Sequence, residues 1–512
     1  MKFMFTHAFY DAARGGALVP NSQPVMVLIT GNGPKLISGN TDVTTLDSIL
    51  HGSVTLSDIL ADTGLKKSTI FSSLKRLKTY GVIDSEGEGN DRRYVMSSAP
   101  VFVSCDPDQS SMEPFFEACL FPSTSGFYRN MFYHMIAIGS ANGISLKPML
   151  INYALSLGKT AYDMMGDPIV DKGLKDLLDY LTDTGAGEFE IIDMIPLRIG
   201  MSLMKEMPPI SSAIYSEFIS TIIARFVSLS TGRTYVAKTV NTEEKNGFVL
   251  EISPSKIPYP QAYGVFPLTS IRMDSNSIGP LSIYRTRQGF QAVSDKEGIS
   301  VLSVITDKGL SVRDISKTLG LGEKDVSSHL SRLESLGIVT AHAGEKSTIY
   351  RSNNRPMMNW NTDSARPMME HFIPLENAFR EPDYFFYYVV SYMIIRVASI
   401  GSDITGALFS FAGHVAEHLL SIMEQPTMKK VIEAMEPCSF RKIHVESFMP
   451  FTAITEADHD LEPYIADHLS GFDTMFFGRI MESLTGHMHV VKDSRIYGEG
   501  HRYHRFTLES HD

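Results

Sequence analysis

Apolar side chains recur at helical spacing in two segments that lie half a chain apart. Ile70, Leu74 and Leu77 follow the i, i+4, i+7 spacing of one buried helix face, and the segment 326–333 repeats this pattern with Val and Leu. A shorter apolar run precedes the first segment and ends at Gly64, where a tight turn favours a residue without a Cβ. Each segment therefore predicts two helices joined by a short glycine-containing turn.

The two segments are copies related by a shift of 256 residues. LDSILHGSVTLSDILADTGLKKSTIFSSLKRLKTYGVI begins at Leu46, and LSVITDKGLSVRDISKTLGLGEKDVSSHLSRLESLGIV begins at Leu302. The shift carries Asp58 to Asp314 without a gap. Because the period is half of the 512 residues, the pattern indicates an internal duplication of the whole chain.

Each half also has matching flanks. An extended lead-in (PVMVLI, PLSIY) precedes each copy, and long apolar helices, strand-like runs and a closing hairpin follow it; the proline-marked segment 253–261 forms the joint. We predict an α+β protein in which each half is a small helical head followed by an α/β domain. The expected division is lead-in 1–40, first head 41–98, rear domain 99–252, linker and lead-in 253–296, second head 297–354 and rear domain 355–512.

Helix, turn, helix, glycine stop and a two-stranded wing occur in this order in both copies, with Gly81 and Gly337 as the stops. This order resembles the winged helix-turn-helix of ArsR- and MarR-like repressors. The resemblance implies that the second helix enters the major groove of double-stranded DNA and that the wing meets the backbone. In the first head it places groove contacts at Lys67, Ser68, Thr69, Ser72 and Ser73, and phosphate contacts at Lys66, Lys75, Arg92 and Arg93.

The second head is less basic on the same face. The resemblance places DNA contacts at Lys324, Ser327, Ser328, His329 and Arg332, with Lys346 and Arg351 in the wing. Glu323 and Asp325 lie among them and weaken the electrostatic attraction to phosphate. We therefore expect two unequal half-sites, and a winged helix that docks protein instead of DNA is the alternative.

The end of the chain, LTGHMHVVKDSRIYGEGHRYHRFTLE, resembles the close of the 4-vinyl-reductase-like domain, a ligand-binding α/β fold fused to winged helices in methanogen regulators. The resemblance rests on a helix ending in Leu-Thr-Gly, a strand, Gly500 and an aromatic arm ending in Phe506. It implies that the rear domains sense a small apolar ligand, the redox state or a partner. His504 and Ile496 stand where the family commonly has cysteines, which puts a cysteine metal site in doubt.

Metal and thiol chemistry have only partial support. His487, His489, His501 and His504 are weak candidates for metal ligands, because no Cys or acidic pair completes the set, and a polar surface hairpin explains them better. The three cysteines, Cys105, Cys119 and Cys438, suit a reducing cytoplasm and form no CxxC pair. We expect no cofactor. The aromatic helices at 128–137 and 384–395, together with 27 methionines, suggest an apolar pocket beneath them or simply a core.

Composition limits the remaining function classes. The chain is 43% apolar, and its 46 basic and 58 acidic residues give a net charge of −12, so DNA contact must come from local basic patches. The most apolar stretch, from Tyr384, is too short to span a bilayer. Catalytic motifs such as G-x-S-x-G or a Walker loop are not found, so we expect no enzyme. The sequence predicts a cytoplasmic transcriptional regulator, either a monomeric pseudo-dimer or a homodimer; a protein-interaction scaffold is the alternative.

Overall fold

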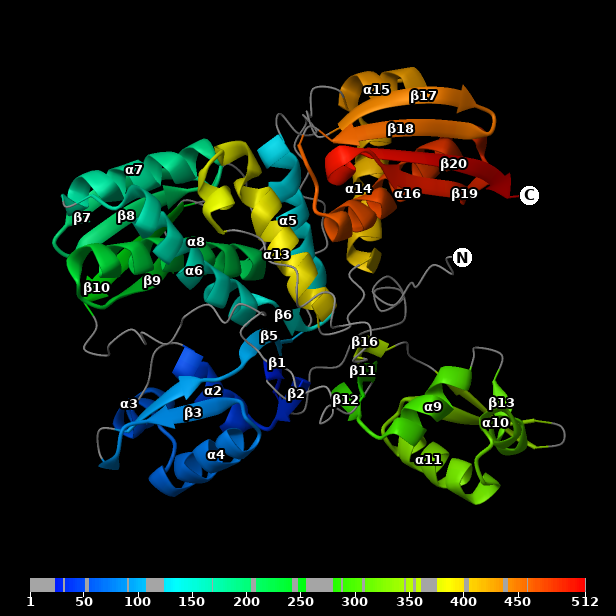
Figure 1. Cartoon of the computed structure of the whole chain (residues 1–512), viewed down its shortest axis with the longest axis horizontal. Coiled ribbons are helices and arrows are strands. Elements are labelled where there is room, and N and C mark those ends of the chain that lie inside the picture. Colours follow the sequence, from blue (N-terminus) through cyan, green and yellow to red (C-terminus); the bar gives the residue numbers. More distant parts are fainter. Residues whose placement is uncertain are drawn as a thin grey trace.

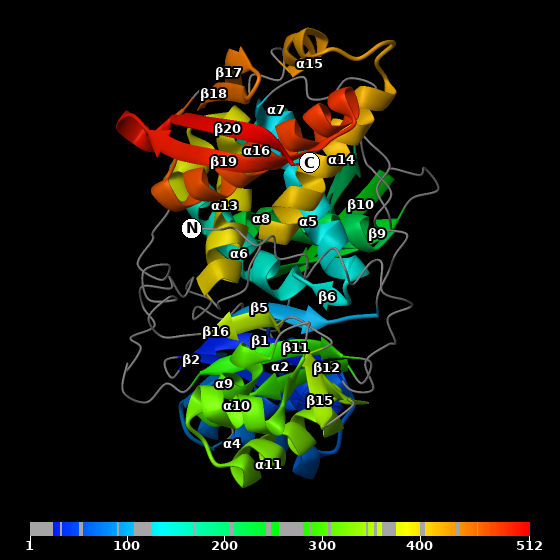
Figure 2. The same cartoon turned by 90° about the vertical axis from the view of Figure 1, so that its right-hand side faces the viewer.

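The computed structural model describes residues 24–30, 33–50, 55–89, 92–106, 124–167, 169–203, 209–241, 247–254, 280–286, 289–305, 309–344, 347–352, 356–360, 375–399, 405–435, 441–457 and 459–511. Two small heads lie side by side at one end, and two larger α/β parts lie at the other (Figure 1). The view turned by 90° gives the same division (Figure 2). Most of the joint at 253–261, with Cys119, Lys346 and Cys438, falls outside these residues.

The first head contains the two predicted helices and the wing. Its elements are α2 (Asn40–Leu50), α3 (Leu56–Thr63), α4 (Lys67–Thr79), β3 (Ile83–Glu86) and β4 (Arg93–Met96). Ile70, Leu74 and Leu77 are all buried, as the spacing predicts, and pack with Leu46 and Ile59 in a small core of the head. The apolar stripe of α4 is therefore what fixes this helix across α2 and α3.

The second head repeats these elements. It contains α9 (Lys296–Val304), β13 (Leu310–Ser311), α10 (Val312–Leu319), α11 (Glu323–Ser335), β14 (Val339–Ala343) and β15 (Thr348–Ser352). The bounds of α10 and α11 differ from those of α3 and α4 by the same 256 residues that relate the two sequence segments. Val326, Leu330 and Leu333 are buried in its own core.

The turns between the paired helices also agree. Thr55 and Ser311 are the N-cap residues of α3 and α10, and each forms a capping box with the aspartate three residues later. Both helices end at a glycine in the left-handed region, with φ of 65° at Gly64 and 68° at Gly320. A side chain with a Cβ would strain this backbone, so the glycine sets the direction in which the second helix leaves.

Two antiparallel sheets lie between the heads and the rear parts (Figures 1 and 2). The first has the order β2-β1-β5-β6, and the second has the order β12-β11-β16. Phe102 and Phe290 connect them, with ring centroids 6.0 Å apart. The strands are β1 (Val25–Thr30), β2 (Gly33–Ser38), β5 (Ala99–Ser104), β6 (Ile144–Ser145), β11 (Leu281–Thr286), β12 (Gly289–Val293) and β16 (Pro356–Trp360).

Each rear part has a four-stranded antiparallel sheet against long helices, and the order is β7-β8-β10-β9 in one and β17-β18-β20-β19 in the other. The first comprises α5 (Thr124–Ala141), α6 (Lys147–Met165), α7 (Val170–Asp183), β7 (Glu188–Met194), β8 (Leu197–Ser202), α8 (Pro209–Thr231), β9 (Tyr235–Asn241) and β10 (Gly247–Pro254). The second comprises η4 (Leu375–Phe379), η5 (Pro382–Tyr384), α13 (Phe385–Ser399), α14 (Thr405–Ser421), α15 (Met428–Met435), β17 (Arg441–Phe448), β18 (Phe451–Ala457), α16 (Pro463–Thr485), β19 (Met488–Tyr497), η7 (Glu499–His501) and β20 (Tyr503–His511).

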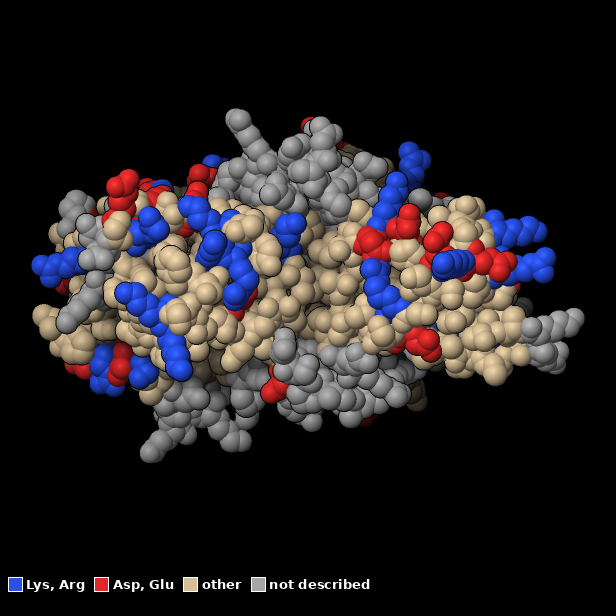
Figure 3. Space-filling model, turned by 90° about the horizontal axis from the view of Figure 1, so that it is seen from below, with Lys and Arg blue, Asp and Glu red and all other residues tan. Residues whose placement is uncertain are grey.

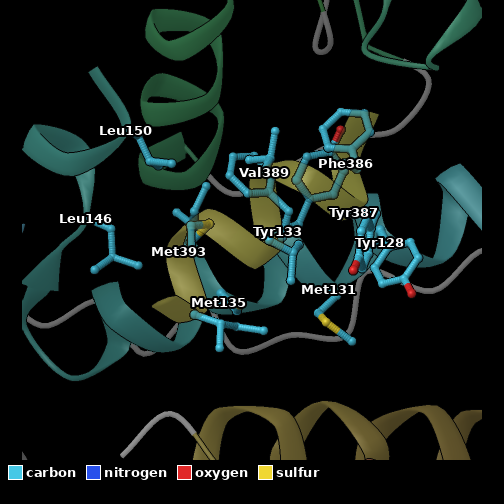
Figure 4. Packing of buried hydrophobic residues seen from close by; sticks show 14 of the residues in the cluster. Tyr128, Met131, Tyr133, Met135, Leu146, Leu150, Phe386, Tyr387, Val389 and Met393 are labelled. Carbon is cyan, nitrogen blue, oxygen red and sulfur yellow. The ribbon is translucent and has the colours of Figure 1, made fainter. Parts of the chain in front are cut away.

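The two aromatic helices cross between the rear parts. On α5, Phe127 packs its ring against Phe411 of α14 and Phe472 of α16, at centroid distances of 5.6 and 5.2 Å. On α13, Phe386 and Tyr392 in turn pack against rings of α8 and α6. Figure 4 shows the buried side chains of α5 and α13 meeting in the same cluster. The rear parts therefore share one hydrophobic core, which the sequence pattern did not predict.

One segment of α8, Ser211–Thr231, is long and apolar enough to cross a membrane, but 72% of its apolar window is buried inside the protein. It packs against α6 and the sheet as a core helix does. Length and composition here reflect the shared core and are weak evidence for a membrane span.

Candidate nucleic-acid interface

The face of the first head that the helix-turn-helix exposes is polar and basic. Of the positions predicted to meet DNA, Lys66, Lys67, Ser68, Ser72 and Lys75 on or next to α4 are exposed, and Thr69 is half-buried. Arg92 and Arg93 of the wing are exposed as well. Seen from below, Lys and Arg side chains spread over this head (Figure 3). The N-terminus of α4 adds backbone N–H groups that suit phosphate.

The structure corrects one of the predicted groove contacts, Ser73. Its side chain is fully buried and donates to Asp42 Oδ1 over 2.6 Å. Arg76 also binds Asp42, through Nε at 3.1 Å from Oδ2 and Nη2 at 2.6 Å from Oδ1. The hydrogen bond to Asp42 raises the pKa of Arg76 above its already high value. Ser73 thus fastens α4 to α2 from the inner face and cannot reach the groove.

Phe71 is a candidate that the sequence reasoning missed. It follows Ile70 on α4, yet 52% of its surface is exposed, next to Ser72 on the outer face. An exposed aromatic ring on a recognition helix can contact a thymine methyl group or a sugar. A phenylalanine is ordinarily assigned to the core. The signal in the sequence that Phe71 is exposed is its position outside the helical stripe of buried residues.

The same face of the second head carries acids among its polar residues. Glu323, Lys324, Asp325, Ser327 and Ser328 are all exposed on α11. Figure 3 shows red side chains among the blue ones at the centre of this head, whereas on the first head the red ones lie mainly toward its edges. This mixture of charges predicts a weaker attraction to the DNA backbone than at the first head.

Two of the predicted contacts of the second head are held by acids of α9. Asp295, the N-cap residue of α9, accepts a hydrogen bond from the Arg332 guanidinium. His329 lies 3.3 Å from the Asp295 carboxylate and 3.1 Å from that of Glu297. Partial burial raises the pKa of Asp295, but its bonds to Arg332 and to the Gly298 N–H outweigh burial and lower it. Arg332 and His329 would have to share or leave these partners to bind DNA, so their role there stays a prediction.

The C-terminal histidines do not form a common site. The His504 ring is buried and lies 2.8 Å from Asp473, whereas His487 and His501 are exposed and His489 contacts the His487 carbonyl oxygen. Within the part of the chain that the structure describes, no group of three or more His, Cys, Asp or Glu side chains could hold a metal ion. Cys105 is half-buried just after β5.

Comparison with known families identifies one of the heads. The family "Bacterial regulatory protein, arsR family" matches residues 299–341, which run from α9 into β14. No curated protein and no solved structure matches the chain. The match covers the two helices, their glycine turn and the first strand of the wing. The chain therefore contains an ArsR-family helix-turn-helix domain, of the kind that serves DNA-binding transcriptional regulators.

Proposed function

We propose that the protein is a DNA-binding transcriptional regulator in which one chain does the work of a homodimer. The observation that carries this proposal is the pair of winged heads whose helices α3, α4, α10 and α11 keep the same bounds at a shift of 256 residues. Both heads lie at the same end of the molecule (Figures 1 and 2). If they keep a pseudo-twofold relation on DNA, the half-sites are separated by about one helical turn, ~34 Å.

The first head would supply most of the affinity. Its exposed Lys66, Lys67, Lys75, Arg92 and Arg93 form a local basic patch on a chain whose net charge is −12. A local patch on an acidic body favours selective over indiscriminate binding. The second head would read its half-site more weakly, and the link through one chain compensates by raising the effective concentration of its DNA.

The rear parts would form the sensor, as in the 4-vinyl-reductase-like domains that the end of the chain resembles. Their two sheets share one strand order, which supports an origin by duplication. Their common core is rich in aromatic and methionine side chains, which adapt to an apolar ligand. A ligand that separates α5 from α13 would act on both heads, because the two sheets that lie between the heads and the rear parts pack against this core. Repression or activation of transcription in the cytoplasm would follow.

Binding of the purified protein to DNA from its own upstream region, against unrelated DNA and across a salt series, tests this function. We expect preference for the upstream DNA and affinity that falls with salt. Arg92→Ala with Arg93→Ala should reduce the salt slope by about two. Lys175→Ala with Lys442→Ala, which removes two exposed lysines of the rear parts, is the matched control and should leave the slope unchanged. Weak binding without sequence preference would favour the protein-interaction scaffold instead.

A further inference from the structure

A series of hydrogen-bonded polar side chains crosses the sheet of the second rear part near one edge. It involves Thr455 of β18, Asp473 of α16, Ser494 of β19 and His504 of β20. Among the described strands, the order β17-β18-β20-β19 places β19 at the edge, so these contacts run from the core under β18 to this edge. Asp473 and His504 are almost fully buried, with side chains 3% and 2% exposed, whereas Ser494 is exposed.

The contacts along this series are those of a nucleophile, a base and the carboxylate that orients the base. Ser494 Oγ lies 3.0 Å from His504 Nε2, and His504 Nδ1 lies 2.8 Å from Asp473 Oδ2. Thr455 donates to the same carboxylate oxygen at 2.7 Å. With Asp473 ionised, Nδ1 carries the imidazole proton, which leaves Nε2 as the acceptor for the Ser494 hydroxyl proton.

The first rear part has apolar side chains at the matching places. Strands β8 and β10 of the first rear part correspond to β18 and β20 of the second. The third inward-facing pair is Met201 with Phe248 in the first and Thr455 with His504 in the second. Asp473 is the eleventh residue of the 23-residue helix α16, and Ile219 is the eleventh of the 23-residue helix α8. Met201, Ile219 and Phe248 are all buried. The fold is thus built without this polar set, which points to a role other than packing.

The surroundings favour a neutral carbonyl compound over a phosphate ester. Arg505 pairs with Glu446 at 2.8 Å and Lys492 pairs with Glu509, while Arg495, next to Ser494, lies over the ring of Tyr497. Phe506 lies opposite Ser494 in the strand register, and its ring stacks on that of His504 at 5.0 Å. An uncharged acyl group fits beside such a serine better than a dianion does.

We propose that Ser494 is a nucleophile activated by His504 and Asp473, and that it takes an acyl group from an activated ester or thioester. Ser494 Oγ forms a bond to the carbonyl carbon while its proton passes to His504 Nε2. The bond to the alcohol or thiol then breaks, and that group leaves with the proton from His504. Water releases the acid in the reverse sequence and restores Ser494. Thr455 acts through Asp473 as a positioning residue.

This activity goes beyond DNA binding and departs from the expectation that the chain is no enzyme. The sequence motifs for serine nucleophiles depend on neighbours along the chain, whereas Asp473, Ser494 and His504 come together from one helix and two strands. The test of this activity contains no DNA. The proposed acyl transfer can therefore fail while the proposed regulatory function holds, and the regulatory function can fail while acyl transfer holds.

The experiment treats the full-length protein with p-nitrophenyl acetate and follows release of p-nitrophenolate together with acetylation of individual peptides. We expect acetyl on the peptide that carries Ser494 and its loss in Ser494→Ala. Ser510→Ala, at an exposed serine of β20, is the matched control and should leave the release rate unchanged.

A second variant separates chemistry from folding. Thr455→Met, Asp473→Ile and His504→Phe together install the side chains of the first rear part, so the sheet should fold with an unchanged circular dichroism spectrum. Without its base, Ser494 should be acetylated about 100-fold more slowly or not at all. Acetylation of Ser494 no faster than that of Ser510, or at full rate in the triple variant, would overturn the proposal.

Discussion

Removal of the Asp42 carboxylate should loosen helix α4 of the first head selectively. Asp42 accepts three hydrogen bonds from α4, one from the buried Ser73 and two from Arg76, whose side chain is 47% exposed. In Asp42→Ala, the hydroxyl of Ser73 loses its buried partner, which costs about 1–3 kcal/mol. The loss of the partly exposed Arg76 pair adds up to about 1 kcal/mol.

Together these losses amount to roughly 3 kcal/mol, or about a 100-fold increase in opening of α4. Because the chain has several domains, a single unfolding free energy does not describe the effect, and amide hydrogen exchange along α4 is the suitable assay. The amides of α11 provide an internal reference. Glu88→Ala, at an exposed acid of the same head, is the control. If α4 exchanges no faster in Asp42→Ala than in Glu88→Ala, the inner-face attachment is not what holds this helix.

Three further predictions concern other parts of the molecule. Glu323→Lys with Asp325→Lys should tighten DNA binding at low salt and steepen the salt slope, measured by fluorescence anisotropy, with Glu334→Lys at the far end of α11 as a weaker comparison. Burial lowers the pKa of His134 to about 3, so below pH 6.5 this residue binds a proton in the unfolded chain but not in the folded protein. The free energy of unfolding should therefore fall as the pH drops from 6.5, by roughly 3 kcal/mol at pH 4. In thermal unfolding, His134→Phe should flatten this pH profile, whereas His501→Phe should not. Phe127→Ala should cost about 3–5 kcal/mol and lower the melting temperature of both rear parts together, and two separate transitions would contradict a shared core.

The heads follow from the sequence because their structure is local. The spacing of Ile70, Leu74 and Leu77 predicts α4, and Gly64 and Gly81 predict where the helices turn and end, as the structure confirms. The prediction for Ser73 is wrong because a serine beside a buried stripe looks the same in sequence whether it faces solvent or an aspartate 31 residues away.

The rear parts were less predictable because their contacts are distant. Helical spacing identifies an apolar face but not its partner, so the crossing of Phe127 to Phe411 leaves no mark in the local pattern. The sequence suggests His504 as a metal ligand together with the histidines near it along the chain. Its actual partner, Asp473, lies on a helix 31 residues earlier and faces inward from α16.

The unlike surfaces of α4 and α11 make the two heads that would contact DNA different from each other. A homodimer looks the same after half a turn, so it binds a promoter equally well in either direction. Here a basic head and an acid-bearing head are fixed in one chain by a common core, and exchanging their places gives a different complex. On a site with unequal halves, such a protein would sit in one orientation only. Its rear parts would then always face the same neighbour along the DNA, and a signal could be directed upstream or downstream by the sequence of the site alone.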